Sequence, residues 1–252
     1  MPHTLIKQCP SFIQRVKGEN KLAIAEMFCD TIQGEGLYAG VPATFIRLQG
    51  CTLKCSFCDT LNVWPQGNEY SFDEIFKMWE SVDLVTRLRD GQHLILTGGS
   101  PLKQESRLIG FITAFVSRYH FKPFIEVENE AVLAPSTNFE QFVDWWNNSP
   151  KLSNSGMKHK VRVKPAVMEY MARLTNSSFK FVVSSTQDWQ EIVRDYIEPF
   201  GIRKEQIILM PEGQTQAELQ LSRPIVAQMA IDNQVRLSDR LHVTIWDRAT
   251  AV

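Results

Sequence analysis

The segment His-Leu-Ile-Leu-Thr-Gly-Gly at residues 93–99 predicts a short buried strand that is ended by two glycines. A helical pattern follows it from about Gln104 to Tyr119. A strand that leads into a helix predicts a parallel β–α unit, because parallel strands need a long crossover connection. In folds built from such units, functional residues lie at the C-terminal ends of the strands. The small and polar residues after this strand are therefore candidates for a functional site.

The same alternation of strands and helices continues along the chain from residue 43. Strands are expected over 43–48, 93–97, 124–128, 179–183, 206–210 and 242–246. Helices are expected from Ser71, where Glu74 completes a capping-box pattern, and over 104–119, 188–197 and 215–232. About six β–α units fall short of the eight in a closed barrel. The pattern favours an α/β fold with an open or partial (β/α) barrel over a doubly wound sheet.

The domain organisation is expected to be simple. The polar stretch Asn147–Lys160 contains a proline and a glycine and is expected to be a loop. No linker is long enough to separate two domains. Residues 1–22 have no clear hydrophobic period and are expected to form an N-terminal extension. We therefore expect a single domain over residues 1–252.

Composition excludes several classes of protein. The 252 residues contain 27 Lys and Arg against 28 Asp and Glu, so the formal net charge is −1. A nearly neutral chain has no overall field that would attract nucleic acid or an anionic membrane. The first residues, Met1–Gln8, lack a secretory pattern, and no run approaches the ~20 apolar residues that span a bilayer. A cytoplasmic protein without nucleic-acid or membrane partners is expected.

Three cysteines form the motif C-x3-C-x2-C at residues 51, 55 and 58, directly after the strand that ends at Leu48. Thiolates are soft ligands that suit zinc or iron–sulfur clusters. Zinc would need a fourth ligand, and His93 and Cys29 are not placed nearby in the sequence. A 4Fe–4S cluster on three cysteines leaves one iron open, which can chelate a methionine-like cofactor. The cluster is favoured over zinc and over redox-active or buried thiols, whereas Cys9 and Cys29 are expected to be buried.

The motif with an aromatic residue, Phe57, before its last cysteine resembles the signature of the radical S-adenosylmethionine superfamily. The block from Glu26 to Thr60, which includes Gln33-Gly34-Glu35-Gly36 and Cys58-Asp59-Thr60, resembles the 7-carboxy-7-deazaguanine synthase family more closely. Residues 97–99, 149–152 and 210–213 resemble further segments of that family in the same order. The resemblance implies a partial barrel of the radical S-adenosylmethionine type.

The resemblance also implies a reaction. A 4Fe–4S cluster would reduce S-adenosylmethionine to methionine and a 5′-deoxyadenosyl radical, which takes a hydrogen from 6-carboxy-5,6,7,8-tetrahydropterin. Ring contraction with loss of ammonia would then give 7-carboxy-7-deazaguanine, a step towards queuosine. Mg2+ would assist, and S-adenosylmethionine would be recovered. A homodimer and an electron donor such as flavodoxin are implied as well.

The implied site residues follow from position in the family pattern. Cys51, Cys55 and Cys58 would hold the cluster, and Thr60 would bind Mg2+. The residues implied along S-adenosylmethionine are Phe57, Cys58, Asp59, Gly98, Gly99, Ser100, Glu128, Ser149, Pro150, Lys151 and Ser184. The residues implied at the substrate are Ile32, Gln33, Gly34, Glu35, Arg47 and Thr97. No catalytic residue is expected beyond the cluster ligands.

Three of these roles suit the chemistry of the side chains. The fork of Arg47 can hold the substrate carboxylate bidentately, although a surface arginine is the plain alternative. The Gln33 amide matches the donors and acceptors of a pterin edge, although Gln33–Gly36 could be an ordinary glycine turn. The Thr60 hydroxyl is an oxygen ligand of the kind that Mg2+ prefers, although an ordinary turn threonine is the alternative.

Two positions depart from the pattern. Ser100 stands where many superfamily members carry an acid that contacts the amino group of the cofactor, and a neutral hydroxyl makes a weaker contact. Residues 128–131, Glu-Asn-Glu-Ala, lack the small residues expected there for ribose contacts. The region after about residue 214 matches least. Trp145, Trp146 and Trp189 are expected in the core or an interface rather than against a cofactor.

Two rival functions share the cysteine motif. An activase that makes a glycyl radical in a partner protein would lack the context of Gln33–Gly36 and Asp59-Thr60. A zinc or iron–sulfur binding module without enzymatic activity would cleave no cofactor. The synthase is the expected function.

Overall fold

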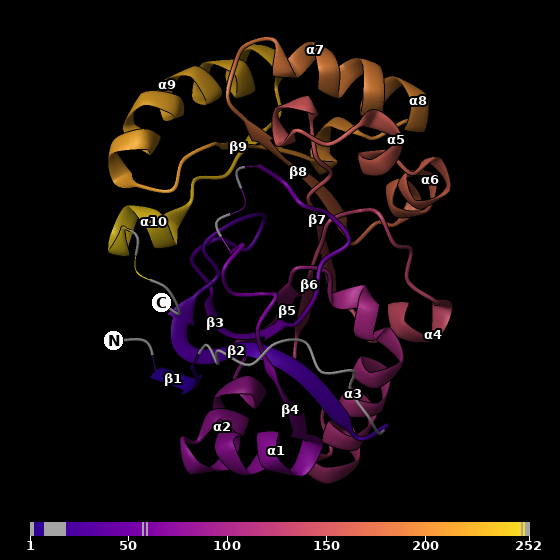
Figure 1. Ribbon diagram of the computed structural model, residues 1–252, viewed down its shortest axis with the longest axis vertical. Coiled ribbons are helices and arrows are strands. Elements are labelled where there is room, and N and C mark those ends of the chain that lie inside the picture. Colours follow the sequence, from indigo (N-terminus) through magenta and orange to yellow (C-terminus); the bar gives the residue numbers. More distant parts are fainter. Residues whose placement is uncertain (1–2, 8–18, 57, 59, 248, 250–252) are drawn as a thin grey trace.

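The computed structural model describes residues 3–7, 19–56, 58, 60–247 and 249, and arranges them around one continuous sheet (Figure 1). The strand order is β1-β2-β3-β5-β6-β7-β8-β9-β10, and β4 pairs with β2. β2 pairs antiparallel with β1, β3 and β4, whereas every pairing from β3 onward to β10 is parallel. The strands are β1 (His3–Ile6), β2 (Lys21–Ile32), β3 (Pro42–Leu48), β4 (Asn68–Ser71), β5 (His93–Gly98), β6 (Ile125–Asn129), β7 (Trp145–Asn148), β8 (Ser177–Val183), β9 (Ile207–Pro211) and β10 (Arg236–Leu237).

Helices join the parallel strands and lie outside the arc of the sheet (Figure 1). The α-helices are α1 (Phe72–Ser81), α2 (Leu84–Arg89), α3 (Glu105–Tyr119), α4 (Thr137–Glu140), α5 (His159–Arg162), α6 (Pro165–Arg173), α7 (Asp188–Ile192), α8 (Glu198–Phe200), α9 (Gln216–Asn233) and α10 (Leu241–Trp246). Short 3-10 turns lie at Pro101–Gln104, Ser153–Ser155 and Lys204–Gln206, and a π turn lies at Val193–Ile197. This confirms the expected open α/β fold of alternating β–α units.

The core lies between the sheet and its helices. All residues of β5 except Gly98 are buried, as expected for a parallel strand covered on both faces. Helix α3 turns Leu108, Phe111, Ile112 and Phe115 towards this core. Trp146 is fully buried against Phe139, so the prediction that it belongs to the core is confirmed. Among the described residues, no helix combines the length and the apolar character that crossing a membrane requires.

Two sequence-based expectations about the later strands were wrong. Residues 242–246 form helix α10 instead of a strand. Their β-branched residues favour a strand. In the structure, however, Val243 is buried and Ile245 is 52% exposed, so these two alternate residues do not share one buried face as they would in a strand. The expected loop at Asn147–Lys160 begins inside β7. The polar asparagines of this strand hid it. They are buried, and each donates a side-chain hydrogen bond, such as that from Asn148 Nδ2 to Ser177 Oγ at 2.8 Å.

The sheet also begins earlier in the chain than the sequence predicted. Part of the extension expected over residues 1–22 contributes to the sheet, because β1 pairs with β2 and Leu22 is fully buried. The twelve-residue strand β2 then pairs with three other strands. One domain over residues 1–252 stays a prediction. Cys29 on β2 is buried as expected, whereas Cys9 lies outside the described residues.

The capping box at the start of α1 is confirmed. Ser71 Oγ accepts a hydrogen bond from the Glu74 amide at 3.3 Å, and the Glu74 carboxylate accepts one from the Ser71 amide at 2.7 Å. Both contacts satisfy amides that the first helical turn leaves without partners.

We predict that Ser71→Ala lowers the free energy of unfolding by about 1 kcal/mol, because the Glu74 amide loses its acceptor. Ser81→Ala is the matched control, since Ser81 Oγ donates to the Met78 carbonyl within the last turn of the same helix. Urea unfolding followed by circular dichroism measures both. Equal effects in the two variants would contradict the capping role.

Candidate active site

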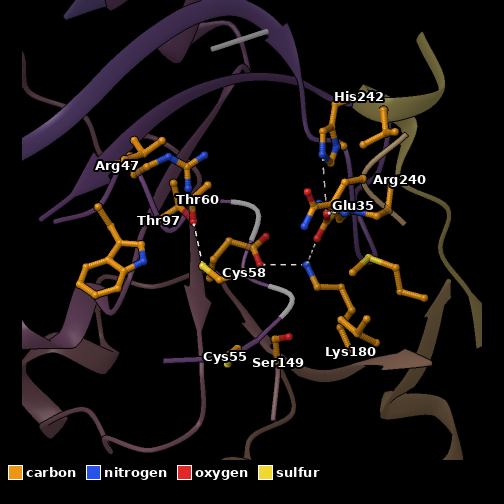
Figure 2. Close-up of a pocket in the computed structure, with 18 of the residues that line it drawn as sticks. Glu35, Arg47, Cys55, Cys58, Thr60, Thr97, Ser149, Lys180, Arg240 and His242 are labelled. Carbon is orange, nitrogen blue, oxygen red and sulfur yellow. Dashed lines mark hydrogen bonds and ion pairs between the residues drawn. The ribbon is translucent and has the colours of Figure 1, made fainter. Parts of the chain in front are cut away.

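The C-terminal ends of the parallel strands surround one cavity of about 900 Å3. Arg47 of β3, Thr97 of β5, Glu128 of β6, Lys180 of β8 and Met210 of β9 all line it. The volume lies in the upper part of the range for small-molecule sites. The cavity therefore lies where the β–α topology predicts a functional site, and Figure 2 shows side chains from several of these elements around it.

Most of the predicted site residues meet in this cavity. Those that line it are Ile32, Gln33, Gly34, Glu35, Arg47, Cys51, Cys55, Cys58, Thr60, Thr97, Gly98, Gly99, Glu128, Ser149, Lys151 and Ser184. Ser100 and Pro150 are buried and do not line it. Phe57 and Asp59 lie outside the described residues. These positions bring the residues together, and the role of each stays a prediction.

The cysteine segment runs along one wall of the cavity. Cys51 Sγ accepts a hydrogen bond from the Leu53 amide at 3.3 Å, and Cys58 Sγ lies 3.7 Å from Thr60 Oγ1. Burial raises the pKa of the Cys51 and Cys55 thiols. Three thiols on one wall of a large cavity fit an iron–sulfur cluster that needs space on its open side.

Neither of the two residues considered as a fourth zinc ligand reaches this wall. Cys29 Sγ lies 3.7 Å from the His3 carbonyl oxygen on the far side of β2, and His93 Nδ1 lies 2.7 Å from Glu126 Oε1. Within the described part of the chain, no three His, Cys, Asp or Glu side chains form a group that could hold a metal ion. Neither Cys29 nor His93 is therefore placed to complete a zinc site with the three motif cysteines.

Gly98 and Gly99 bring the end of β5 against the cysteine segment. A Cβ on Gly98, whose φ is +141°, would lie 2.3 Å from the Leu48 carbonyl oxygen. A Cβ on Gly99 would lie 2.4 Å from both the Gly50 carbonyl oxygen and Cys51 Cβ. Both contacts are closer than a side chain permits. The glycines thus have a packing role in placing Cys51, in addition to the predicted approach to a cofactor.

Arg47 is held by an ion pair. Its Nε donates to Glu26 Oε1 at 2.6 Å, and the Glu26 residue is only 2% exposed. Because Nε is used, the fork formed by Nη1 and Nη2 is the part of the guanidinium that could receive a carboxylate. The plain alternative of a surface arginine does not describe this side chain.

Gln33 is held more tightly than expected. Its Nε2 donates to Glu126 and Glu128 at 3.3 and 3.2 Å, and its Oε1 accepts from the Glu35 amide at 3.3 Å. The side-chain amide is thus occupied within the protein, and its contact with a pterin edge stays a prediction. The Gly34 carbonyl accepts from the Leu241 amide at 2.9 Å, which ties this segment to α10.

A charge cluster around the buried Lys180 faces the cysteines across the cavity, and Figure 2 marks ion pairs of this cluster with dashed lines. Lys180 Nζ lies 2.5 Å from Glu35 and 3.0 Å from Glu128, and its side chain is 3% exposed. Arg240 Nε lies 3.0 Å from Glu35, and His242 Nε2 lies 3.9 Å from it. Two carboxylates thus share one ammonium, and Glu35 has two further basic neighbours.

The pKa shifts follow from this sharing. Burial raises the pKa of Glu35, but the charges of Lys180, Arg240 and His242 outweigh it and hold that pKa well below its usual range. Burial raises the pKa of Glu128, and Lys180 only partly offsets this. Burial lowers the pKa of Lys180, but its two carboxylates raise it above the usual value.

Sequence reasoning missed Lys180, Arg240, His242 and Glu130, all of which line the cavity. Lys180 interrupts the apolar strand Phe179–Val183, and a lysine inside a buried run is a signal that could have found it. His242 was hidden by the wrong strand assignment of 242–246.

Comparisons with known proteins show the family to which the chain belongs. Residues 32–132, which include the three motif cysteines, match the family described as "4Fe-4S single cluster domain". The fold resembles the crystal structure of QueE from Escherichia coli, with a TM-score of 0.62 and 22% identity over 88% of this chain and 95% of that one. The fold and the cysteine wall thus define a protein of the iron–sulfur cluster class.

Curated relatives narrow the class. The 7-carboxy-7-deazaguanine synthase of Pyrobaculum aerophilum is 30% identical over 91% of this chain and 96% of its own length. That of Halobacterium salinarum is 31% identical over 90% of this chain and 91% of its own length. The chain belongs to the 7-carboxy-7-deazaguanine synthase family.

We predict that Lys180→Met lowers the free energy of unfolding by at most about 3–5 kcal/mol near neutral pH, because it leaves two partly buried carboxylates without their shared ammonium. The deficit should shrink as pH falls from neutrality towards the usual pKa range of a carboxyl group, since Glu128 already has a raised pKa and takes up a proton more easily once Lys180 is lost. Urea unfolding at several pH values measures this.

The sign of the wild-type dependence follows from the same shifts. Glu35 contributes to the free energy of unfolding above the pKa of an unfolded glutamate. This contribution is lost as pH falls through the lowered pKa of Glu35 in the folded protein. Lys180 contributes to the free energy of unfolding below the pKa of an unfolded lysine. This contribution is lost only as pH rises through the raised pKa of Lys180 in the folded protein. Adding Glu128→Gln to Lys180→Met should recover part of the stability. A deficit that is independent of pH and unaffected by Glu128→Gln would contradict the shared ion pair.

Proposed function

We propose that this chain converts 6-carboxy-5,6,7,8-tetrahydropterin to 7-carboxy-7-deazaguanine with loss of ammonia, on the route to queuosine and related deazapurines. The observation that carries the proposal is the meeting of three motif thiols, Arg47 and the Gln33–Glu35 segment in one cavity of a chain from this family. The near-complete coverage of the relatives favours the synthase over an activase or a binding module.

Cys51, Cys55 and Cys58 would hold the 4Fe–4S cluster, and the residues around Gly98 and Gly99, Ser149 and Lys151 would lie along S-adenosylmethionine. When bound, these groups supply the one-electron cleavage and the hydrogen abstraction that start the reaction. The chain itself binds and orients. Lys151 Nζ donates to Ser149 Oγ at 2.7 Å, which holds this side chain at the cavity wall.

Arg47 would bind the carboxylate of the substrate. The Glu26 pair fixes the guanidinium plane before substrate arrives, so little side-chain freedom is lost on binding. The charge cluster around Lys180 would hold the segment from Gln33 to Glu35 in place at the opposite side. The substrate ring would then lie between a rigid cation and a segment fixed by hydrogen bonds.

Further parts of the proposal extend the family resemblance. Thr60 would bind Mg2+ through its hydroxyl oxygen, which lines the cavity beside Cys58. On the same resemblance we also propose a homodimer, a flavodoxin-type electron donor and a cytoplasmic location.

We predict that Cys51→Ala, Cys55→Ala and Cys58→Ala each abolish formation of 5′-deoxyadenosine and of 7-carboxy-7-deazaguanine, because each removes a ligand of the cluster. Mass spectrometry of anaerobic assays with S-adenosylmethionine, reductant, Mg2+ and the pterin measures both products. Cys29→Ala is the matched control and should retain iron and activity, since Cys29 is buried on β2 away from the cavity. Full activity in any of the three variants would refute the cluster assignment.

We predict that Arg47→Ala and Arg47→Lys raise the KM for the pterin about 10- to 100-fold, because both lose the bidentate contact with its carboxylate. Cleavage of S-adenosylmethionine without pterin should persist in both. Arg47→Lys keeps a positive charge beside the buried Glu26, so it separates substrate binding from damage to the fold. An unchanged pterin affinity in both variants would show that the carboxylate binds elsewhere.

A further inference from the structure

Glu130 is a buried carboxylate at the cysteine wall that the proposed function leaves without a role. It follows β6, lines the cavity and is 6% exposed. Thr52 Oγ1 and Ser100 Oγ donate to its Oε1 at 2.6 and 2.7 Å. No described residue donates to its other oxygen, Oε2, although that atom is buried.

An unsatisfied oxygen on a buried carboxylate is costly. Leaving a buried acceptor without a donor costs about 1–3 kcal/mol, and more when the group is charged. Most buried polar atoms in native proteins have a partner, and a carboxylate at the wall of a cavity can receive its missing donor from a molecule bound in that cavity. The orphaned oxygen therefore points to a ligand with an N–H donor or a positive charge.

The position of Glu130 limits where this ligand lies. Glu130 lines the same cavity as Cys51 and Cys55. Thr52, one of its two donors, lies next to Cys51 in the chain. A ligand group that reaches Glu130 from the cavity would therefore lie beside the proposed cluster site.

We propose that Glu130 accepts a hydrogen bond from the α-amino group of S-adenosylmethionine. This inference rests on the proposed function, because it assigns a residue to the cofactor of that reaction. The amino group would supply N–H donors, and the sulfonium of the same molecule would add a positive charge that a carboxylate favours. Hydrogen bonds from Thr52 and Ser100 hold the Glu130 carboxylate in place before the cofactor binds. The side chain therefore loses little conformational freedom on binding.

The pair of Ser100 and Glu130 also joins the two departures noted in the sequence. Ser100 stands where many superfamily members carry an acid, and Glu130 belongs to the segment 128–131 that departs from the family pattern. Ser100 Oγ donates a hydrogen bond directly to Glu130. Ser100 then acts as a positioning residue, and Glu130, the residue directly after β6, provides the carboxylate.

The test measures binding of S-adenosylmethionine by equilibrium dialysis to anaerobically reconstituted, unreduced enzyme, so no turnover is involved. Glu130→Gln should weaken binding about 10- to 100-fold, as expected for loss of a charged hydrogen bond. Glu218→Gln is the matched control, because it removes a carboxylate of the same cavity from helix α9 while the amide can keep the capping box. Its affinity should stay within about twofold of the wild type.

Two further measurements separate a direct contact from a general effect. With an analogue that lacks the α-amino group, Glu130→Gln should have little further effect, since the donor is already absent. The double variant Ser100→Glu with Glu130→Ser moves the carboxylate across a 2.7 Å contact and should recover most of the affinity. This double variant also decides the question if Glu130→Gln alone loses its iron.

The outcomes are distinct for the two proposals. A wild-type enzyme that neither binds S-adenosylmethionine nor forms product from the pterin would overturn the proposed function and this inference together. An active wild type with unchanged affinity in Glu130→Gln overturns this inference alone. Loss of Mg2+ affinity in Glu130→Gln, with unchanged affinity for S-adenosylmethionine, would assign the carboxylate to the cation and also overturn it.

Discussion

The close contact between the end of β5 and the segment after β3 is the constraint on which the site depends. Gly98 and Gly99 pack against Leu48, Gly50 and Cys51 at distances that leave no space for a side chain. The Ser100 amide donates to the Gly50 carbonyl at 2.8 Å, which closes the same contact. As a result the cysteine segment lies at the ends of the strands, and the three cysteines line the cavity there.

Opposite charges organise the other side of the cavity. Lys180, Glu35, Glu128 and Arg240 come from four different elements or loops, and their pairing holds these together. A buried ion pair is expensive to form, so its value lies in fixing one arrangement of the wall. The chain thus surrounds a place for radical chemistry with a rigid framework of glycine contacts on one side and shared charges on the other.

Local sequence signals predicted those features that local physics determines. The Ser71–Glu74 box, the buried strand at 93–98 and the cysteine motif each depend on neighbours in the chain, and each appeared where expected. Strand β7 could not be predicted, because its asparagines become acceptable in a sheet only when partners such as Ser177 satisfy them. Helix α10 could not be predicted either, because packing against the rest of the fold outweighs the preference of its β-branched residues for a strand.

The same distinction applies to the site. Residues named from the family pattern mostly reached the cavity, but their partners did not follow from that pattern. The pairing of Arg47 with Glu26, and of Ser100 with Glu130, joins residues 21 and 30 positions apart. Such pairs depend on which strands become neighbours, which single-residue patterns do not encode.

The contact between Gly34 and α10 has a consequence for how the cavity comes into being. A Cβ on Gly34 would lie 2.2 Å from His242 Nδ1, and Glu35 pairs with Arg240, which is 205 residues later in the chain. A ribosome that has made the first of these segments has not yet made the second. The full enclosure of the cavity therefore forms only after translation has passed residue 242.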